Sequence, residues 1–214
     1  MVFKVKRSLV FGILVSALLL LSGQAAWPSA QPRTLLVLGD SISAGYGLQS
    51  GESWVALLQQ RLTAQGYGYR VINASVSGET TTGGLSRIPR ALALHKPAVV
   101  ILELGANDGL RGLPLDTTRA NLSRMVELSV GARAQVLLVG MKIPPNYGPR
   151  YALGFEKIFS ELATQRKLAL VPFFLEDVAL APGLMQDDGL HPTAKAQPLM
   201  LQTLWPSLLP LLKR

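Results

Sequence analysis

The feature that most constrains this chain is a set of five short, almost uninterrupted apolar runs, separated by longer segments with helical periodicity. Runs of this kind are typical of strands that are buried on both faces of a parallel sheet. Helical crossovers between them are what parallel strands require. The pattern therefore predicts a three-layer α/β fold with a five-stranded parallel sheet. The runs are residues 34–40, 69–75, 98–105, 135–142 and 168–174.

The segments between and after these runs place apolar residues at helical spacing. We expect Pro89 to interrupt one of these helices and the prolines of the last segment to kink or break another, because proline lacks the backbone N–H of a helix interior. The length of 214 residues favours a single domain, which we place at residues 34–212. The expected helices are residues 53–65, 82–95, 116–130, 151–167 and 193–212.

Residues 1–26 have the features of a secretory signal peptide. Lys4, Lys6 and Arg7 precede an apolar run over residues 9–21, and small residues follow it. This run is shorter than the roughly 18–20 residues that a membrane span needs. We therefore expect the segment to be cleaved and the mature protein to be periplasmic or secreted, without a stable membrane span. A retained membrane anchor is the alternative.

The composition excludes several classes of chemistry. The chain has no cysteine, which excludes disulfides, thiolate nucleophiles and thiolate metal ligands. It has two histidines, His95 and His191, whose spacing does not suggest a pair of metal ligands. The net charge of +8 comes from single basic residues spread along the chain. Because no basic patch is evident, we expect no nucleic-acid partner. Without thiolates or a histidine pair, we also expect no bound metal.

Polar residues follow three of the predicted strands. Ser41 comes directly after the first apolar run, Gly78 follows the second and Asn107 follows the third. Open parallel sheets bind their ligands beyond the carboxyl ends of the strands, so these residues should share one edge. Ser41 is a candidate nucleophile, and a glycine N–H and an asparagine amide are the kinds of donor that an oxyanion hole needs. Each residue alone could equally be an ordinary turn residue.

A fourth element, residues 185–197, contains one of the two histidines. Asp188 precedes His191 by three residues, with a glycine between them and a proline after. A carboxylate on one ring nitrogen fixes the imidazole tautomer and leaves the other nitrogen free to take a serine proton. By spacing alone, Asp187 competes for this role. His95, at the end of a helical segment, is expected to be a surface or capping residue.

These four segments together resemble a known group of enzymes. The stretch "GDSIS", then Gly78, then "GAND" and "DGLHP", has the order and spacing of the four sequence blocks of the SGNH hydrolase (GDSL lipase/esterase) superfamily. Within this superfamily, the chain resembles the bacterial periplasmic arylesterase, acyl-CoA thioesterase and lysophospholipase enzymes, from Leu35 to Gln197. The resemblance implies a flavodoxin-like sheet with helices on both faces.

The resemblance also implies a role for each of these residues. Ser41 would be the nucleophile, His191 the general base and then the general acid, and Asp188 the carboxylate that orients the imidazole. The backbone N–H groups of Ser41 and Gly78 and the side chain of Asn107 would form the oxyanion hole. No cofactor is needed for this chemistry, and we expect a monomer that acts on small-molecule esters or thioesters, with lysophospholipids among the candidates.

The expected substrates carry medium to long acyl chains. Residues 108–114 and 142–151 should lie beside the site, and their apolar residues and glycines are suited to an acyl groove with movable walls. The alternative within the superfamily is a deacetylase that acts on short acyl esters of carbohydrate or lipid. The residues proposed to contact substrate are Asp108, Gly109, Leu110, Pro145 and Tyr147.

Two alternatives from other classes fit the sequence less well than a hydrolase. A nucleotide-binding domain would need the dinucleotide fingerprint, but Gly45, Gly47 and Gly51 are spaced one residue too long for it. The second predicted strand also lacks a terminal acidic residue to hold a ribose. A non-catalytic binding module of the cell envelope should lack one of the four blocks, and none is missing.

Overall fold

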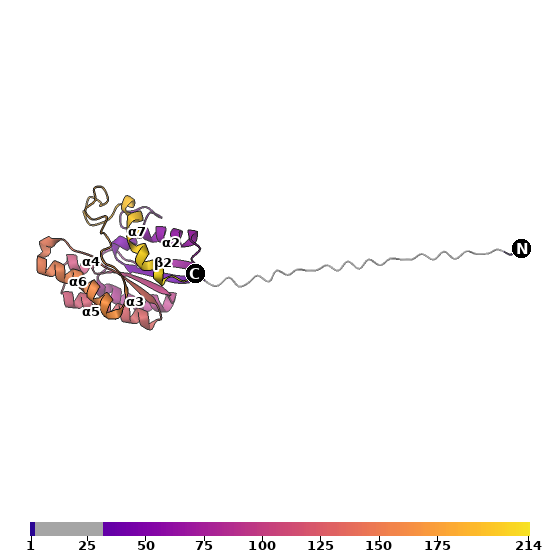
Figure 1. Cartoon of the computed structure of the whole chain (residues 1–214), viewed down its shortest axis with the longest axis horizontal. Helices are drawn as coiled ribbons and strands as arrows, with labels where there is room; N and C mark the ends of the chain where they lie inside the picture. Colours follow the sequence, from indigo (N-terminus) through magenta and orange to yellow (C-terminus); the bar gives the residue numbers. More distant parts are fainter. Residues whose placement is uncertain (3–31) are drawn as a thin grey trace. The chain divides into compact units, whose positions relative to one another are not determined.

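The computed structural model contains one sheet of five parallel strands in the order β2-β1-β3-β4-β5 (Figure 1). The structure describes residues 1–2 and 32–214, so the predicted signal peptide lies, apart from its first two residues, outside the described residues. All five strands fall on the predicted apolar runs, and the predicted fold class is confirmed. The strands are β1 (Arg33–Gly39), β2 (Tyr69–Asn73), β3 (Val99–Glu103), β4 (Gln135–Val139) and β5 (Ala169–Val171).

Helices cover both faces of the sheet, α2 and α7 on one face and α3, α5 and α6 on the other (Figure 1). Two further helices, α1 and α4, are short and directly follow β1 and β3. No helix of the described residues is long and apolar enough to cross a membrane. The helices are α1 (Ser41–Ala44), α2 (Trp54–Ala64), α3 (Thr81–His95), α4 (Ala106–Leu110), α5 (Leu115–Gly131), α6 (Pro149–Arg166) and α7 (Gln197–Leu208).

The prolines act differently in α3 and in the last segment. Helix α3 runs through Pro89 without interruption, so the predicted break there is wrong. Ile88 and Leu92 on either side of the proline are buried against the core, and this packing offsets the lost backbone hydrogen bond. The last segment is broken, with a 3₁₀ turn on each side of α7, at Ala194–Ala196 and at Leu209–Leu211, but Pro206 lies within α7 without interrupting it.

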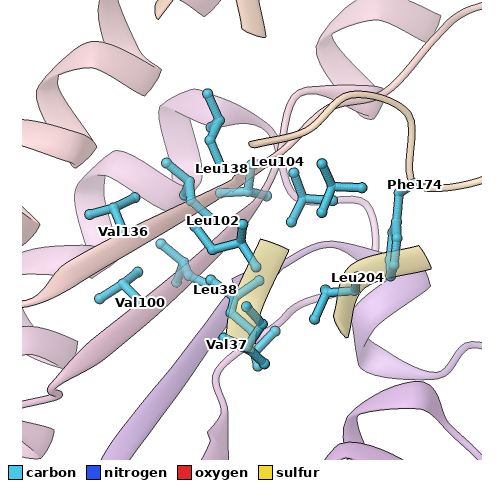
Figure 2. Close-up of a cluster of buried hydrophobic side chains, with 14 of the residues drawn as sticks. Val37, Leu38, Val100, Leu102, Leu104, Val136, Leu138, Phe174 and Leu204 are labelled. Atoms are coloured by element: carbon cyan, nitrogen blue, oxygen red, sulfur yellow. The ribbon is translucent and has the colours of Figure 1, made fainter. Parts of the chain in front are cut away.

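The core lies on both sides of the central strands. Figure 2 shows valine and leucine side chains of β1, β3 and β4 packed together, with Leu204 of α7 and Phe174 nearby. Every labelled side chain there is at most 4% exposed. Trp54 of α2 meets the Phe174 ring edge-on, with the ring centroids 5.3 Å apart. Its backbone N–H donates to Gln197 Oε1 at 2.9 Å, which joins α2 to α7.

The strand order reverses direction between β1 and β3. From β1 the chain first adds β2 on one side and then returns to place β3 on the other. The loops that leave β1 and β3 therefore diverge and open a crevice at the carboxyl edge of the sheet. Ser41 and Asn107 follow these two strands directly. The fold thus brings the sequence blocks to the place where this architecture binds ligands.

Gly140, just after β4, provides a test of the packing at this edge. A Cβ atom there would overlap the backbone carbonyl oxygen of Pro172, whereas a Cβ at Gly131 in α5 would meet nothing within 4 Å. We expect Gly140→Ala to lower the free energy of unfolding by about 1–3 kcal/mol, since backbone cannot yield as a side chain can. Gly131→Ala should leave it unchanged or raise it slightly. Urea denaturation measures both, and equal stabilities would contradict this packing.

Candidate active site

Ser41 is held at the carboxyl edge of the sheet by a tight turn. It is the first residue of α1, and Asp40 before it caps the helix by accepting the backbone N–H of Ile42 at 3.0 Å. Such a cap fixes the direction in which the chain leaves β1. Asp40 and Ile42 are buried while Ser41 is partly exposed. Ser41 is therefore accessible, while the residues on either side of it are packed in the interior.

Ser41, His191 and Asp188 form a chain of two hydrogen bonds. Ser41 Oγ lies 2.8 Å from His191 Nε2, and His191 Nδ1 lies 2.6 Å from Asp188 Oδ2. Asp188 Oδ1 also accepts the backbone N–H groups of Leu190 and His191. The hydrogen bond from the His191 ring, followed by those two backbone bonds, lowers the pKa of Asp188 to about 2. The carboxylate is therefore ionised at neutral pH and favours a proton on Nδ1.

The loop that carries His191 contacts the segment that follows Ser41. The side chain of Gln186 donates to the backbone carbonyl groups of Tyr46 and Pro192. Tyr46 also packs against the imidazole of His191, with the ring centroids 4.4 Å apart. These contacts add to the hydrogen bond with Asp188 in fixing the position of the imidazole. Neither Gln186 nor Tyr46 is distinguishable in the sequence, because both act through tertiary contacts.

Three hydrogen-bond donors face the space beside Ser41. Among the described residues, no acceptor is found for the backbone N–H groups of Ser41 and Gly78. Gly78 has φ of 75°, which side-chain-bearing residues rarely adopt, and Arg111 donates to its carbonyl oxygen at 3.0 Å. Asn107 supplies a side-chain amide whose Nδ2 donates to Asp40 Oδ2 at 3.1 Å. The arrangement suits an anionic oxygen that develops during a reaction.

A cavity of about 280 Å³ opens above these groups. Its polar floor is formed by the serine, the histidine and the three donors, and its walls are mostly apolar. It is lined by Asp40, Ser41, Ile42, Tyr46, Ser77, Gly78, Ala106, Asn107, Leu110, Leu190 and His191. An apolar cavity with a few converging polar groups is the usual form of a small-molecule site.

The five residues predicted to contact substrate divide into three groups. Leu110 lines the cavity. Asp108 and Gly109 are buried beneath it: the Asp108 carboxylate accepts the backbone N–H of Thr81 at 2.8 Å, so it joins α3 to α4 rather than facing the cavity. Tyr147 donates its hydroxyl to the carbonyl oxygen of Leu110 at 2.8 Å. Pro145 begins the same 3₁₀ turn as Tyr147.

The other sequence candidates lie elsewhere. Asp187 is exposed, and Asp188 is the neighbour whose carboxylate contacts His191. His95 is the last residue of α3, at the opposite end of that helix from the cavity. Among the described residues, no three His, Asp or Glu side chains are grouped as a metal site requires.

A serine hydroxyl, an imidazole and a carboxylate in series, at the switch point of a parallel sheet, are the arrangement of a serine hydrolase. The profile of the GDSL-like Lipase/Acylhydrolase family matches residues 37–198, and the chain belongs to this family. It is a serine hydrolase that acts on ester bonds.

Named relatives and solved structures agree with this assignment. The chain is 53% identical over 196 residues to Esterase TesA of Pseudomonas aeruginosa, covering 92% of this chain and 95% of that protein. It is 42% identical over 183 residues to Thioesterase 1/protease 1/lysophospholipase L1 of Escherichia coli, covering 86% of each. The crystal structure of TesA superimposes with a TM-score of 0.82 at 54% identity, covering 84% of this chain and 99% of that one.

The adjacent aspartates 187 and 188 allow a matched test of the site. We expect Asp188→Asn to lower kcat by about three to four orders of magnitude, because an amide at this position favours the wrong imidazole tautomer. The exposed neighbour serves as control, and Asp187→Asn should change kcat less than threefold. Steady-state hydrolysis of a p-nitrophenyl ester measures both. Loss of activity in Asp187→Asn with Asp188→Asn intact would reassign the carboxylate.

Proposed function

We propose that this enzyme hydrolyses carboxylic esters and thioesters through an acyl-enzyme on Ser41. The observation that carries the proposal is the chain from Ser41 Oγ to His191 Nε2 at 2.8 Å and from His191 Nδ1 to Asp188 at 2.6 Å. At these distances His191 would take the serine proton, and Asp188 would stabilise the imidazolium that results.

The reaction then proceeds in two halves. Ser41 Oγ attacks the carbonyl carbon as its proton passes to His191, and the carbonyl oxygen becomes an oxyanion facing the N–H groups of Ser41 and Gly78 and the Asn107 amide. Collapse of this intermediate expels the alcohol or thiol, which receives the proton from His191. A water then attacks the acyl-enzyme as His191 takes its proton, and His191 returns this proton to Ser41 Oγ as the acid leaves. Each oxyanion donor is expected to contribute about 10²- to 10³-fold to kcat.

We propose medium to long acyl chains as the preferred substrates. Ile42, Leu110 and Leu190 give the cavity apolar walls, and beside it Tyr147 borders a second, open cavity of about 720 Å³. The hydroxyl of Tyr147 bonds the backbone of Leu110, so this contact lies between the two cavities. A chain that extended past it would gain about 0.8 kcal/mol for each methylene buried. The relatives named esterase and thioesterase support the range of leaving groups.

A deacetylase for short acyl esters is the second candidate. The first cavity, at about 280 Å³, is large enough for an acetyl group without any use of the second. The dependence of rate on acyl length distinguishes the two candidates.

We also propose that residues 1–26 are removed as a signal peptide and that the enzymatic domain, residues 34–212, acts outside the cytoplasm as a monomer. The support is the order of basic, apolar and small residues at the start of the chain. The sheet begins at Arg33 and the last 3₁₀ turn ends at Leu211, in keeping with these boundaries.

A series of p-nitrophenyl and CoA esters from acetyl to palmitoyl tests the chain-length proposal. We expect kcat/KM to rise from acetyl toward medium and long chains, because the buried methylenes stabilise the transition state. Ser41→Ala, run as the control, should lose about three orders of magnitude or more on every substrate. A rate that peaks at acetyl and falls steeply by hexanoyl would favour the deacetylase instead.

A further inference from the structure

Beneath the nucleophile lies a carboxyl group that the mechanism above does not use. Glu103, the last residue of β3, is fully buried and stands opposite Gly39 in the register of β1 with β3. None of the ion pairs found among residues 32–214 involves it. Its Oε2 accepts the hydroxyl of Ser43 at 2.6 Å and the backbone N–H of Asp40 at 3.4 Å, and its Oε1 has no hydrogen-bond partner.

A second buried carboxyl group, Asp40, is in contact with the first through its backbone. It is 1% exposed, and its two oxygens accept from two donors, the Ile42 N–H on Oδ1 and the Asn107 amide on Oδ2. Both donors are N–H groups without lone pairs, so both require an acceptor. Asp40 thus contacts two parts of the proposed oxyanion hole, the turn that carries Ser41 and the side chain of Asn107.

Two neighbouring carboxyl groups in an apolar interior do not both ionise, because each charge raises the cost of the other. Burial and the nearby Asp40 raise the pKa of Glu103 well above its usual range. Burial also raises the pKa of Asp40, to about 6, and the nearby Asp108 acts in the same direction. The Ile42 N–H, His191 and Asn107 lower this pKa and so limit the rise. Glu103 has one strong donor and an orphaned oxygen, whereas Asp40 has two N–H donors and a nearby imidazole.

We propose that the two carboxyl groups of Asp40 and Glu103 together hold one proton, which is on Glu103. We propose further that the Asp40 carboxylate positions the Asn107 amide in the oxyanion hole. This inference rests on the proposed function. Asn107 has two amide hydrogens, and the bond to Asp40 fixes the rotation of the amide so that the other hydrogen can face the cavity. Glu103, neutral and bonded to Ser43, holds α1 against β3 without adding a second charge beneath the site.

The missing side chain at Gly39 leaves room for the hydrogen bond between Glu103 and Ser43. A Cβ at Gly39 would lie 2.6 Å from Glu103 Oε2 and 2.7 Å from Ser43 Oγ, so any other residue there would displace these two side chains. Asp40 is therefore a positioning residue that acts through Asn107. An asparagine in its place has one oxygen for two donors, so one of them loses its acceptor.

A double-mutant cycle tests whether Asp40 acts through Asn107. We expect Asn107→Ala and Asp40→Asn each to lower kcat by about 10²-fold with little change in KM, the effect of one lost oxyanion donor. The double variant should be no worse than Asn107→Ala alone. Independent effects would multiply to about 10⁴-fold, and that result, or an unaffected kcat in Asp40→Asn, would overturn the positioning role.

The protonation states are read from the wild-type protein, with Glu103→Gln used to assign the glutamate signal. Carboxyl ¹³C shifts at pH 7 should show one protonated glutamate, absent in Glu103→Gln, and an ionised Asp40. Because glutamine resembles the neutral acid, Glu103→Gln should keep kcat at least tenfold above that of Asp40→Asn. An ionised Glu103, or equal loss in these two variants, would overturn the shared proton. Full activity in Ser41→Ala would instead show that the proposed function itself is wrong.

Discussion

Burial of both faces of the sheet is the constraint on which the rest of this structure depends. Strands β1 and β3 are covered on both faces, and all five residues of β3 are buried. The polar residues of the site therefore lie at or beyond the carboxyl ends of these strands, where the chain leaves the core. The reversal of strand order between β1 and β3 separates the two loops that carry Ser41 and Asn107 and leaves space for a substrate.

Three carboxyl groups at this edge have different roles because their environments differ. Asp188 lies in an exposed loop and accepts three N–H donors, which keep it ionised beside His191. Asp40 is buried but faces two donors and the imidazole, and Glu103 is buried with a single strong donor. The same functional group thus serves to orient the imidazole, to aim an amide and to close a turn, and the surrounding donors decide which.

Much of this could be predicted from the sequence because the signals are local. Continuous apolar runs identify the strands, and the spacing of Asp188 to His191 allows one short loop to bring their side chains together. The uninterrupted course of α3 through Pro89 could not be predicted, since the packing of Ile88 and Leu92 decides it. Asp108, which was expected near substrate, binds Thr81 instead, and only the tertiary fold places these two residues together. For Glu103 the sequence contains one weak indication of a special role, an isolated acidic residue within an apolar run.

The central claim is that Ser41 carries the acyl group during turnover. Rapid acid quenching of the enzyme during hydrolysis of a p-nitrophenyl ester, followed by peptide mass mapping, tests this claim directly. The account predicts an acyl adduct on Ser41, lost on standing at neutral pH and more persistent when deacylation is slow. An adduct on Ser43 or Ser77, with Ser41 unmodified, would contradict it.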